Sequence, residues 1–331
     1  MFTRPTDLPD SLLADLVRSA WAIEVEDVEY LPVGFGSHHW VATAGDRRWF
    51  VTVDASGTGS PALGTAGVAP QLRAALSTAS LLREMGLHFV VAPIATSLGE
   101  ILAPIDSRYA VAVYPFIDGE VHGWGPYPDP DFRQKVFDRI VALHTAPTEA
   151  RRHILTDRFE IPSRHTVEAL GVEVPPDETT PWDAGPFAEP TRQLLARNSR
   201  WIEGRFASYD SLVTSDAARS DRFVITHGEP HVANTITSSS EVMLVDWDTA
   251  LLAPPERDLW WFAGEAPGLV AEYEEQTGTP IIREALELYR LRWDLTDLAL
   301  FAAQLRHPHD DNKDTRTAWK ALTKILAAGR L

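Results

Sequence analysis

A polar segment lies between two apolar runs in the second half of the chain, and it constrains the fold more than any other feature. Residues 227–234 read His-Gly-Glu-Pro-His-Val-Ala-Asn and directly follow the apolar run 223–226. A second apolar run, 242–245, ends in the acidic residues Asp246 and Asp248. Short apolar runs bounded by turn residues favour β-strands. The pattern therefore predicts a polar site held between two strands, not an exposed turn.

The spacing of this segment resembles the catalytic machinery of protein-kinase-like phosphotransferases, nearest to the aminoglycoside phosphotransferase and choline kinase family with its spectinomycin-type kinases. In that chemistry a carboxylate aligns the substrate hydroxyl and takes its proton, while an Asn and a later Asp hold Mg²⁺ on the phosphates of ATP or GTP. The resemblance assigns these roles to Glu229, Asn234 and Asp246. It also implies that His227 supports the loop backbone and that Asp258 is a structural acid.

Glu229 departs from the family pattern, which has Asp at this position. Glu keeps the charge and adds one methylene. A displacement of about 1 Å costs on the order of a hundredfold in rate when geometry limits the chemistry. We therefore expect the backbone around Glu229 to be placed so that the longer side chain fits.

A second interpretation of the same segment is a transition-metal site. His227, Glu229 and His231 alternate at period two, so an extended strand would place two His and one carboxylate on one face. Gly228 and Pro230 make a regular strand unfavourable there, and this interpretation leaves Asn234 and Asp246 unexplained.

Composition excludes several classes of protein. The chain has 331 residues and no cysteine, which excludes disulfides, thiolate metal sites and Cys nucleophiles. Its formal net charge of −17 disfavours nucleic acids and anionic membranes as partners. The first residues do not resemble a signal peptide and no apolar run is long enough for a membrane span, so we expect a cytoplasmic protein, either a monomer or a homodimer.

The pattern of elements predicts an α+β, bilobal, protein-kinase-like fold with a small antiparallel-sheet lobe and a larger, mainly helical lobe. We expect a nucleotide-binding lobe at 1–117 and a helical lobe with the catalytic loop and substrate site at 118–331. The small lobe is predicted to contain a helix after Asp10, strands at 28–32, 39–44, 48–53, 89–92 and 109–114, and a helix at 72–82. Residues 57–67 are expected to form a mobile connection, and residues 145–190 to form loops or an insert. Helices are expected at about 132–143, 194–206, 255–264, 281–305 and 316–328.

The nucleotide side is predicted at the turn between the first two strands and at the link between the lobes. A kinase covers the phosphates with a Gly-rich turn, here Gly34, Gly36 and Ser37. The resemblance places the adenine-binding hinge where the fifth strand ends, at Tyr114, Pro115, Phe116 and Ile117.

The small lobe lacks the lysine that kinases use to bind the α- and β-phosphates. Thr52 stands in its place, and the first lysine in the chain is Lys135. Arg73 stands where the helix glutamate that pairs with this lysine is expected. We expect Arg73 to supply the missing cation, with His38 or His39 as lesser candidates.

The predicted function is an ATP- or GTP-dependent O-phosphotransferase acting on a small, amine-bearing alcohol such as an antibiotic or an amino alcohol. Acidic and aromatic side chains hold such substrates in the family. The available residues are Asp248, Glu265, Asp294, Asp297, Trp260, Trp261 and Trp293. The alternative is a catalytically degenerate relative that binds nucleotide or a small ligand, favoured by the loss of the lysine.

Overall fold

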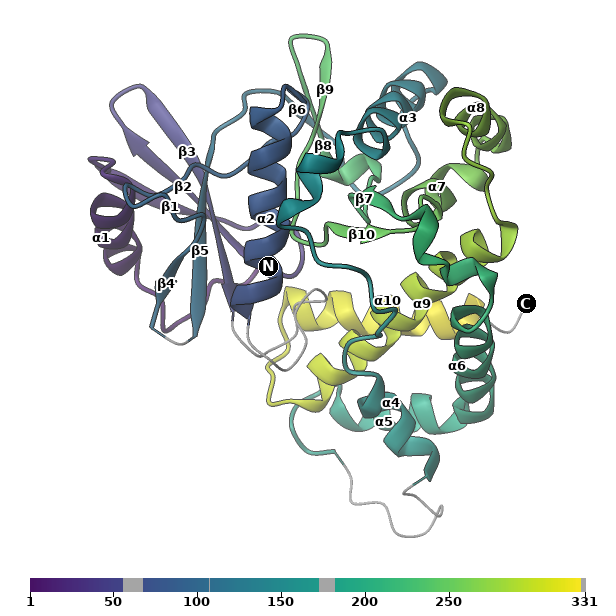
Figure 1. Ribbon diagram of the computed structural model, residues 1–331. Coiled ribbons are helices and arrows are strands. Elements are labelled where there is room, and N and C mark those ends of the chain that lie inside the picture. Colours follow the sequence, from purple (N-terminus) through teal and green to yellow (C-terminus); the bar gives the residue numbers. More distant parts are fainter. Residues whose placement is uncertain (56–67, 107, 173–181, 329–331) are drawn as a thin grey trace.

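The small lobe is built on one antiparallel sheet. The computed structural model describes residues 1–55, 68–106, 108–172 and 182–328, so the connection predicted at 57–67 lies outside the described residues. The sheet has the order β1-β2-β3-β5-β4 (Figure 1). Its strands are β1 (Asp27–Leu31), β2 (His38–Ala44), β3 (Arg47–Ala55), β4 (Ala103–Ile105) and β5 (Tyr109–Pro115).

Two helices cover the two faces of this sheet. Helix α1 (Asp10–Trp21) buries Leu13 and Val17 against strand residues such as Trp40, and it lies on the outer face. Helix α2 (Val68–Glu84) packs on the other face and shares its core with Phe137 and Trp247 of the large lobe. The apolar core therefore continues from the small lobe into the large one.

The strand predicted at residues 89–92 is wrong. Val90 makes only an isolated bridge to Leu244, while the edge of the sheet is formed by β4. The backbone at this point pairs with the large lobe, because the Leu244 amide donates to the Phe89 carbonyl and the Val91 amide donates to the Leu244 carbonyl. The apolar run thus joins the end of α2 to the strand that precedes Asp246.

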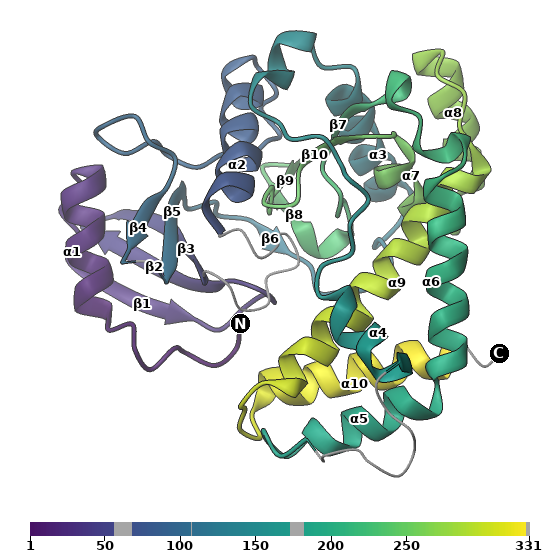
Figure 2. The ribbon, with the colours of Figure 1, turned by 60° about the horizontal axis from the view of Figure 1, so that its bottom comes forward.

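The large lobe consists of helices around two small antiparallel sheets (Figures 1 and 2). Its strands are β6 (Glu120–Val121), β7 (Val224–Thr226), β8 (Thr235–Ser238), β9 (Glu241–Leu244) and β10 (Leu251–Ala253). Its α-helices are α3 (Pro130–His144), α4 (Arg164–Val172), α5 (Ala188–Arg197), α6 (Ser199–Val213), α7 (Glu256–Ala263), α8 (Pro267–Thr277), α9 (Arg283–Arg306) and α10 (Lys313–Ala328). Short 3₁₀ turns are η1 (Thr148–Arg152), η2 (Asp216–Ala218), η3 (Ser220–Arg222) and η4 (Val232–Asn234).

Three parts of the large lobe differ from the prediction. The described part of residues 145–190 includes η1 and α4 and the first turn of α5, so it is not only loop. The apolar pattern predicted as one segment at 194–206 is two helices that meet at Asn198. Helix α8 was not predicted because its apolar pattern is weak and only Leu269 and Tyr273 are buried.

The two lobes also meet at the β1–β2 turn. The Phe35 ring lies on the Phe301 ring of α9, with 5.4 Å between the centroids and 72° between the planes. The backbone amides of Phe2 and Thr3 each donate to the buried carboxylate of Asp314, at 2.8 Å. The β1–β2 turn therefore contacts the large lobe at α9, and the N-terminal residues contact it at α10.

Across the described residues, every helix is too short or too polar to cross a lipid bilayer.

Candidate active site

A buried carboxylate fixes the start of the segment that carries Glu229. The backbone amides of His227 and Gly228 donate to the two oxygens of Asp258, at 2.8 and 2.5 Å. The His144 Nε2 atom lies 3.1 Å from Asp258, and Tyr273 contacts the other side of the His144 ring. Burial alone would raise the pKa of Asp258, but the hydrogen bond from His144 and nearby positive charge hold it below its usual value. The structural role predicted for Asp258 matches these contacts.

Gly228 is required by both conformation and space. Its φ of +98° is a conformation that other residues rarely adopt, and a Cβ there would lie 2.4 Å from the Arg257 guanidinium. Arg257 in turn donates to the Thr226 hydroxyl and to the Thr249 carbonyl. The chain therefore leaves β7 in a sharp turn that directs Glu229 away from the strand.

His227 supports the loop from inside the protein. Its Nε2 donates to the Val245 carbonyl at 2.9 Å, and its Nδ1 accepts from the Glu229 amide at 3.3 Å. Burial lowers the pKa of His227 to about 4, which fits a neutral ring with one donor and one acceptor. Within the described part of the chain, no group of three or more His, Cys, Asp or Glu side chains is arranged to hold a metal. The two-His, one-carboxylate interpretation is therefore not supported.

Glu229, Asn234 and Asp246 are held in one site by short backbone and side-chain bonds. The side-chain amide nitrogen of Asn234 donates a hydrogen bond to the backbone carbonyl of Glu229, at 3.1 Å. The side-chain oxygen of Asn234 is left available. The Val245 amide donates to the Asn234 carbonyl at 3.0 Å, and Asp246 follows with a left-handed φ of +66°. Strained backbone of this kind is maintained only where the surroundings fix it. The Glu229 carboxylate is partly exposed and lies 3.7 Å from the His231 ring.

The floor of the site is strongly acidic. Burial, then the nearby charge of Glu229, raises the pKa of Asp246 to about 6. Burial and the neighbouring Asp246 raise the pKa of Asp248 well above its usual value. Burial also raises the pKa of Asp54 on β3 to about 6, with Asp246 contributing. Asp54 is buried, whereas the side chains of Asp246 and Asp248 keep solvent-accessible surface. Because Asp246 adds to the raised pKa of both Asp54 and Asp248, the three carboxylates form an environment that favours a bound cation.

The residues present fit a magnesium–nucleotide complex. Mg²⁺ is usually bound by one or two carboxylates together with phosphate oxygens and water. The Asp246 carboxylate and the side-chain oxygen of Asn234 supply protein ligands of the required type, and the nearby charge of Glu229 adds to the negative potential at Asp246. Because the remaining ligands would come from the nucleotide and water, the site does not need a third protein ligand.

On the nucleotide side, the Gly-rich turn contacts the floor of the site directly. Gly34 and Gly36 have φ values of +71° and +99°, and the Ser37 hydroxyl donates to the Asp54 carboxylate. Thr52 lies on the same face of β3, two residues before Asp54. A hydrogen bond joins Thr52 to the Tyr114 hydroxyl, whose pKa is raised by burial and by the acidic floor.

The hinge residues follow directly from β5. Pro115 pairs with Trp49 at the end of the strand. The Arg48 guanidinium lies 4.1 Å from the centre of the Phe116 ring and pairs with Asp118. Ile117 continues the link between the lobes, where the resemblance places the adenine contacts.

Arg73 is engaged elsewhere in this structure. Its guanidinium forms an ion pair with Glu100, in the connection that leads to β4. Phosphate binding by Arg73 requires this pair to open, and the assignment stays a prediction. Burial lowers the pKa values of His38 and His39 to about 4, so both are neutral near pH 7 and poor substitutes for a lysine.

The acceptor side of Glu229 is lined by aromatic rings. His231 lies edge-on to Trp124 and Trp261, at 4.5 and 5.2 Å between centroids. Trp124 stacks on Trp293 of α9, with 5.9 Å between centroids and 13° between planes. Trp260 packs on Trp261, at 4.1 Å. These contacts place a largely apolar wall next to the Glu229 carboxylate.

Four carboxylates are predicted to contact the phosphoryl acceptor. Two of them have strongly raised pKa values, and another forms an ion pair with an arginine. Burial, and then the charge of Glu229, raises the pKa of Asp297 to about 8. Asp248 lies on the floor described above, and burial raises the pKa of Asp294 as well. Glu265 instead forms an ion pair with Arg133, 3.5 Å away.

Comparison with known proteins decides the family. A model of the APH phosphotransferase enzyme family matches residues 27–294. The chain belongs to this family. The prediction of a kinase-type phosphotransferase is thereby confirmed at the level of the family. Protein StrN of Streptomyces griseus is 28% identical over 264 residues, which cover 76% of this chain and 75% of StrN.

The solved structures of similar fold include two small-molecule kinases. Spectinomycin phosphotransferase APH(9)-Ia, in complex with ADP and spectinomycin, has a TM-score of 0.72 at 16% identity over 98% of both chains. Choline kinase LicA from Streptococcus pneumoniae has a TM-score of 0.57 at 14% identity, over 96% of this chain and 98% of LicA. These similarities confirm the predicted bilobal, kinase-like fold of this family member.

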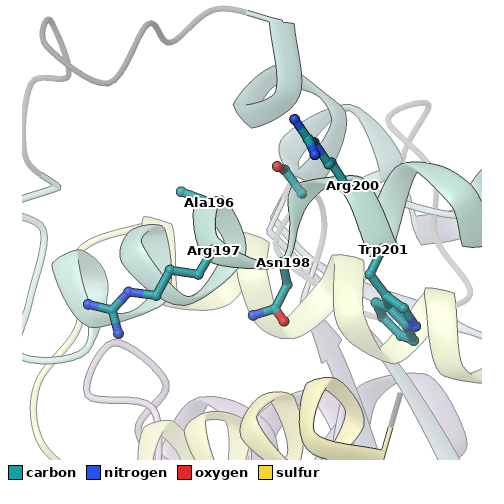
Figure 3. A pocket seen from close by; sticks show the side chains of 6 residues that line it. Ala196, Arg197, Asn198, Arg200 and Trp201 are labelled. Atoms are coloured by element: carbon teal, nitrogen blue, oxygen red, sulfur yellow. The ribbon is translucent and has the colours of Figure 1, made fainter. Parts of the chain in front are cut away.

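A hollow at the corner between α5 and α6 lies outside this site. It is lined by residues that include Arg197, Asn198, Arg200 and Trp201. Figure 3 shows Arg197 and Arg200 pointing to different sides of the corner, so their charges do not converge on one ligand. It adds nothing to the phosphotransferase site.

Sequence reasoning missed two residues of the site. Asp54 was not predicted, although strand alternation places it on the same face as Thr52. Trp124 was also not predicted, because an exposed aromatic residue between Gly123 and Gly125 has no periodic partner in the sequence. Its role becomes visible only through its contacts with His231 and Trp293.

Proposed function

We propose that this protein transfers the γ-phosphoryl group of ATP or GTP, in the presence of Mg²⁺, to a hydroxyl group of a small amine-bearing molecule such as an antibiotic or an amino alcohol. The observation that carries the proposal is that a braced loop holds Glu229 and Asn234, and that the backbone of Val245 ties Asp246 to this loop. Phosphoryl transfer depends mainly on positioning and electrostatic stabilisation, which a braced loop of this kind supplies.

The protein's residues divide the work of the reaction. The Glu229 carboxylate accepts the proton of the acceptor hydroxyl as that oxygen forms its bond to the γ-phosphorus. The bond from the γ-phosphorus to the β,γ-bridging oxygen breaks, and the nucleoside diphosphate leaves with the electron pair. Asn234 and Asp246 hold Mg²⁺, which neutralises charge on the phosphate oxygens when bound. The Gly-rich turn covers the phosphates and keeps water out.

The charges and aromatic rings around the Glu229 carboxylate support an acceptor that carries an amine. The site is acidic and lies beside tryptophan rings, and both features favour a cation. Spectinomycin phosphotransferase and choline kinase, which share the fold, act on amine-bearing alcohols.

The second candidate function is ligand binding without turnover. It is favoured by Thr52, which replaces the phosphate-binding lysine. The two functions differ in whether a phosphorylated product forms.

The test is a transfer assay with ATP and GTP, Mg²⁺ and a panel that contains spectinomycin and choline, read by mass spectrometry. We expect one acceptor to gain a phosphoryl group with equal formation of the nucleoside diphosphate, and Glu229→Gln to slow both by about 10²- to 10³-fold. Nucleotide binding without product from any aminoglycoside, aminocyclitol or amino alcohol in the panel would favour the second candidate.

A further inference from the structure

Side-chain hydrogen bonds hold the backbone of the loop that carries Glu229. The amides of His227 and Gly228 donate to Asp258. The Glu229 amide donates to the ring of His227. The carbonyls of residues 227, 228, 229 and 230 accept, in that order, from the side chains of Thr249, Trp261, Asn234 and Tyr127. Because Pro230 has no amide hydrogen, every backbone polar group of residues 227–230 has a side-chain partner.

This arrangement is unusual for a short loop, because most protein hydrogen bonds join one backbone group to another. The shape of the loop therefore depends on side chains that come from several parts of the fold. Tyr127 is the most distant of the four carbonyl donors in the sequence, since 103 positions separate it from Pro230. It lies between β6 and α3, outside the catalytic motif. The motif alone gives no reason for this contact.

The Tyr127 hydroxyl is held firmly against the loop. It donates to the Pro230 carbonyl at 2.6 Å, the shortest of the four carbonyl bonds. The Tyr127 ring stacks on Phe262 of α7, with 5.7 Å between centroids and 4° between planes, and lies 6.3 Å from the Phe132 ring of α3. Burial raises the pKa of Tyr127 above its usual value, so the hydroxyl keeps its proton and stays a donor. Two helices therefore fix the place of this donor.

Tyr127 and Trp261 hold the chain on the two sides of Glu229. The proline ring fixes φ of Pro230, so a hydrogen bond to its carbonyl restricts the backbone torsion of this residue that is still free. On the other side, the Trp261 indole donates to the carbonyl of the residue before Glu229, at 3.3 Å. Trp261 and Phe262 are neighbours on α7. The same helix therefore fixes the backbone on both sides of Glu229, directly through Trp261 and through the Tyr127 ring that lies on Phe262.

We propose that Tyr127 is a positioning residue for Glu229, and that its bond to the Pro230 carbonyl sets the backbone so that the longer acid presents its carboxylate to the acceptor hydroxyl. The proposal rests on the proposed function and adds to it a residue that acts through Glu229. A catalytic group works only when the residues behind it hold it within a fraction of an ångström. A displacement of about 1 Å costs on the order of a hundredfold in rate.

A double-mutant cycle in the full chain tests the proposal. Tyr127→Phe removes the hydroxyl and keeps the ring that stacks on Phe262. Tyr209→Phe is the matched control, because Tyr209 is also a buried tyrosine whose hydroxyl donates to a backbone carbonyl, that of Phe159 at 2.7 Å. Each variant is made with native Glu229 and with Glu229→Gln. The measurements are kcat and KM with the acceptor found by screening, and hydrogen exchange of the amides of residues 227–234 without ligands, followed by mass spectrometry.

We expect Tyr127→Phe to lower kcat by about tenfold and to change the KM values for ATP and for the acceptor by less than about twofold, because the loss is in the placement of Glu229. In the Glu229→Gln protein no carboxylate is left to place, so the same substitution should lower kcat by less than about twofold. The amides of residues 227–234 should exchange at least about threefold faster in Tyr127→Phe. Tyr209→Phe should leave kcat and this exchange unchanged.

An equal loss of kcat with and without the Glu229 carboxylate would show that Tyr127 does not act through Glu229, and would overturn the proposal. Native exchange rates in Tyr127→Phe would overturn it as well. Transfer by the native protein with an unchanged kcat in Tyr127→Phe would refute only the positioning role. Absence of phosphorylated product from the native protein would refute the proposed function. Exchange, which does not require turnover, would then still decide whether Tyr127 holds the loop.

Discussion

The two sides of the active site are stabilised in opposite ways. On the large-lobe side, Asp258 accepts two backbone amides and a histidine, and its pKa is lowered. On the small-lobe side, Asp54 is equally buried, accepts from the Ser37 hydroxyl, and has a raised pKa. The catalytic loop is therefore preorganised by the protein alone, whereas the nucleotide side has excess negative charge that a cation must balance.

This difference explains how the family's chemistry can persist without its lysine. A lysine on β3 would add a fixed positive charge to the phosphate site. Here Thr52 is neutral and Asp54 adds negative charge, so in the proposed reaction the positive charge would arrive with the nucleotide as Mg²⁺. We therefore expect nucleotide binding to depend on Mg²⁺ more steeply than in a kinase that has the lysine.

The largest expected effect is from Asp246→Ala. It removes the carboxylate at the centre of the acidic floor and should lower kcat/KM on the order of a thousandfold. Steady-state kinetics with the acceptor found by screening provide the measurement. Glu275→Ala, an exposed acid on α8, is the control and should keep full activity. An Asp246→Ala variant with near-native kcat/KM would show that the two sides do not share a cation.

Substitutions of Glu229 test whether the loop is adapted to the longer acid. Glu229→Gln removes the proton acceptor and should reduce kcat by about 10²- to 10³-fold. Glu229→Asp restores the residue usual in the family but withdraws the carboxylate by about one bond, which should cost on the order of a hundredfold. The kcat values of the native protein and of both variants are measured. A Glu229→Asp variant with a higher kcat than the native protein would contradict the inferred adaptation of the backbone.

Asp258→Ala tests the bracing of the large-lobe side. It leaves the amides of His227 and Gly228 and the ring of His144 without their acceptor. The free energy of unfolding should fall by about 3 kcal/mol or more, since each orphaned buried donor costs roughly 1–3 kcal/mol. Urea unfolding measures this loss. A loss below about 1 kcal/mol would mean that the loop holds its shape without Asp258.

Asp54→Asn should raise the free energy of unfolding, which is the opposite of the effect of Asp258→Ala, and the size of the rise depends on pH. With a native pKa of about 6, Asp54 keeps a proton between about pH 4 and pH 6 that the unfolded chain has released. The free energy of unfolding therefore falls as pH rises through this window. Asp54→Asn removes that fall, so it should be more stable than the native protein by roughly 3 kcal/mol above pH 6 and about equal below pH 4. Urea unfolding at several pH values checks this, and destabilisation at pH 8 would contradict the comparison.

The smallest expected effect is from Arg73→Ala. The exposed pair with Glu100 contributes about 0–1 kcal/mol to stability, and the KM for ATP should change less than about threefold if the pair persists. A tenfold or larger rise in this KM, absent in Glu100→Gln, would instead show that Arg73 leaves Glu100 and binds phosphate, as the sequence suggested.

The sequence predicted the large-lobe site better than the small-lobe site, for a physical reason. Local spacing determines which residues one loop brings together, so the pattern of residues 227–234 with Asp246 predicts the candidate site from the sequence alone. The error at residues 89–92 arose because an apolar run does not reveal which backbone it pairs with. Phe35 on Phe301 and Trp124 on Trp293 are contacts between distant segments, and such contacts depend on tertiary packing that a local pattern does not encode.

The central claim is that Asn234 and Asp246 bind nucleotide through a cation in a lobe without the usual lysine. A titration of ATP into the native protein and into Asp246→Ala, each with and without Mg²⁺ and followed by the thermal unfolding midpoint, tests it most directly. We predict a rise in the midpoint of the native protein that requires Mg²⁺ and is lost in Asp246→Ala. An equal rise without Mg²⁺, or an undiminished rise in Asp246→Ala, would contradict the claim.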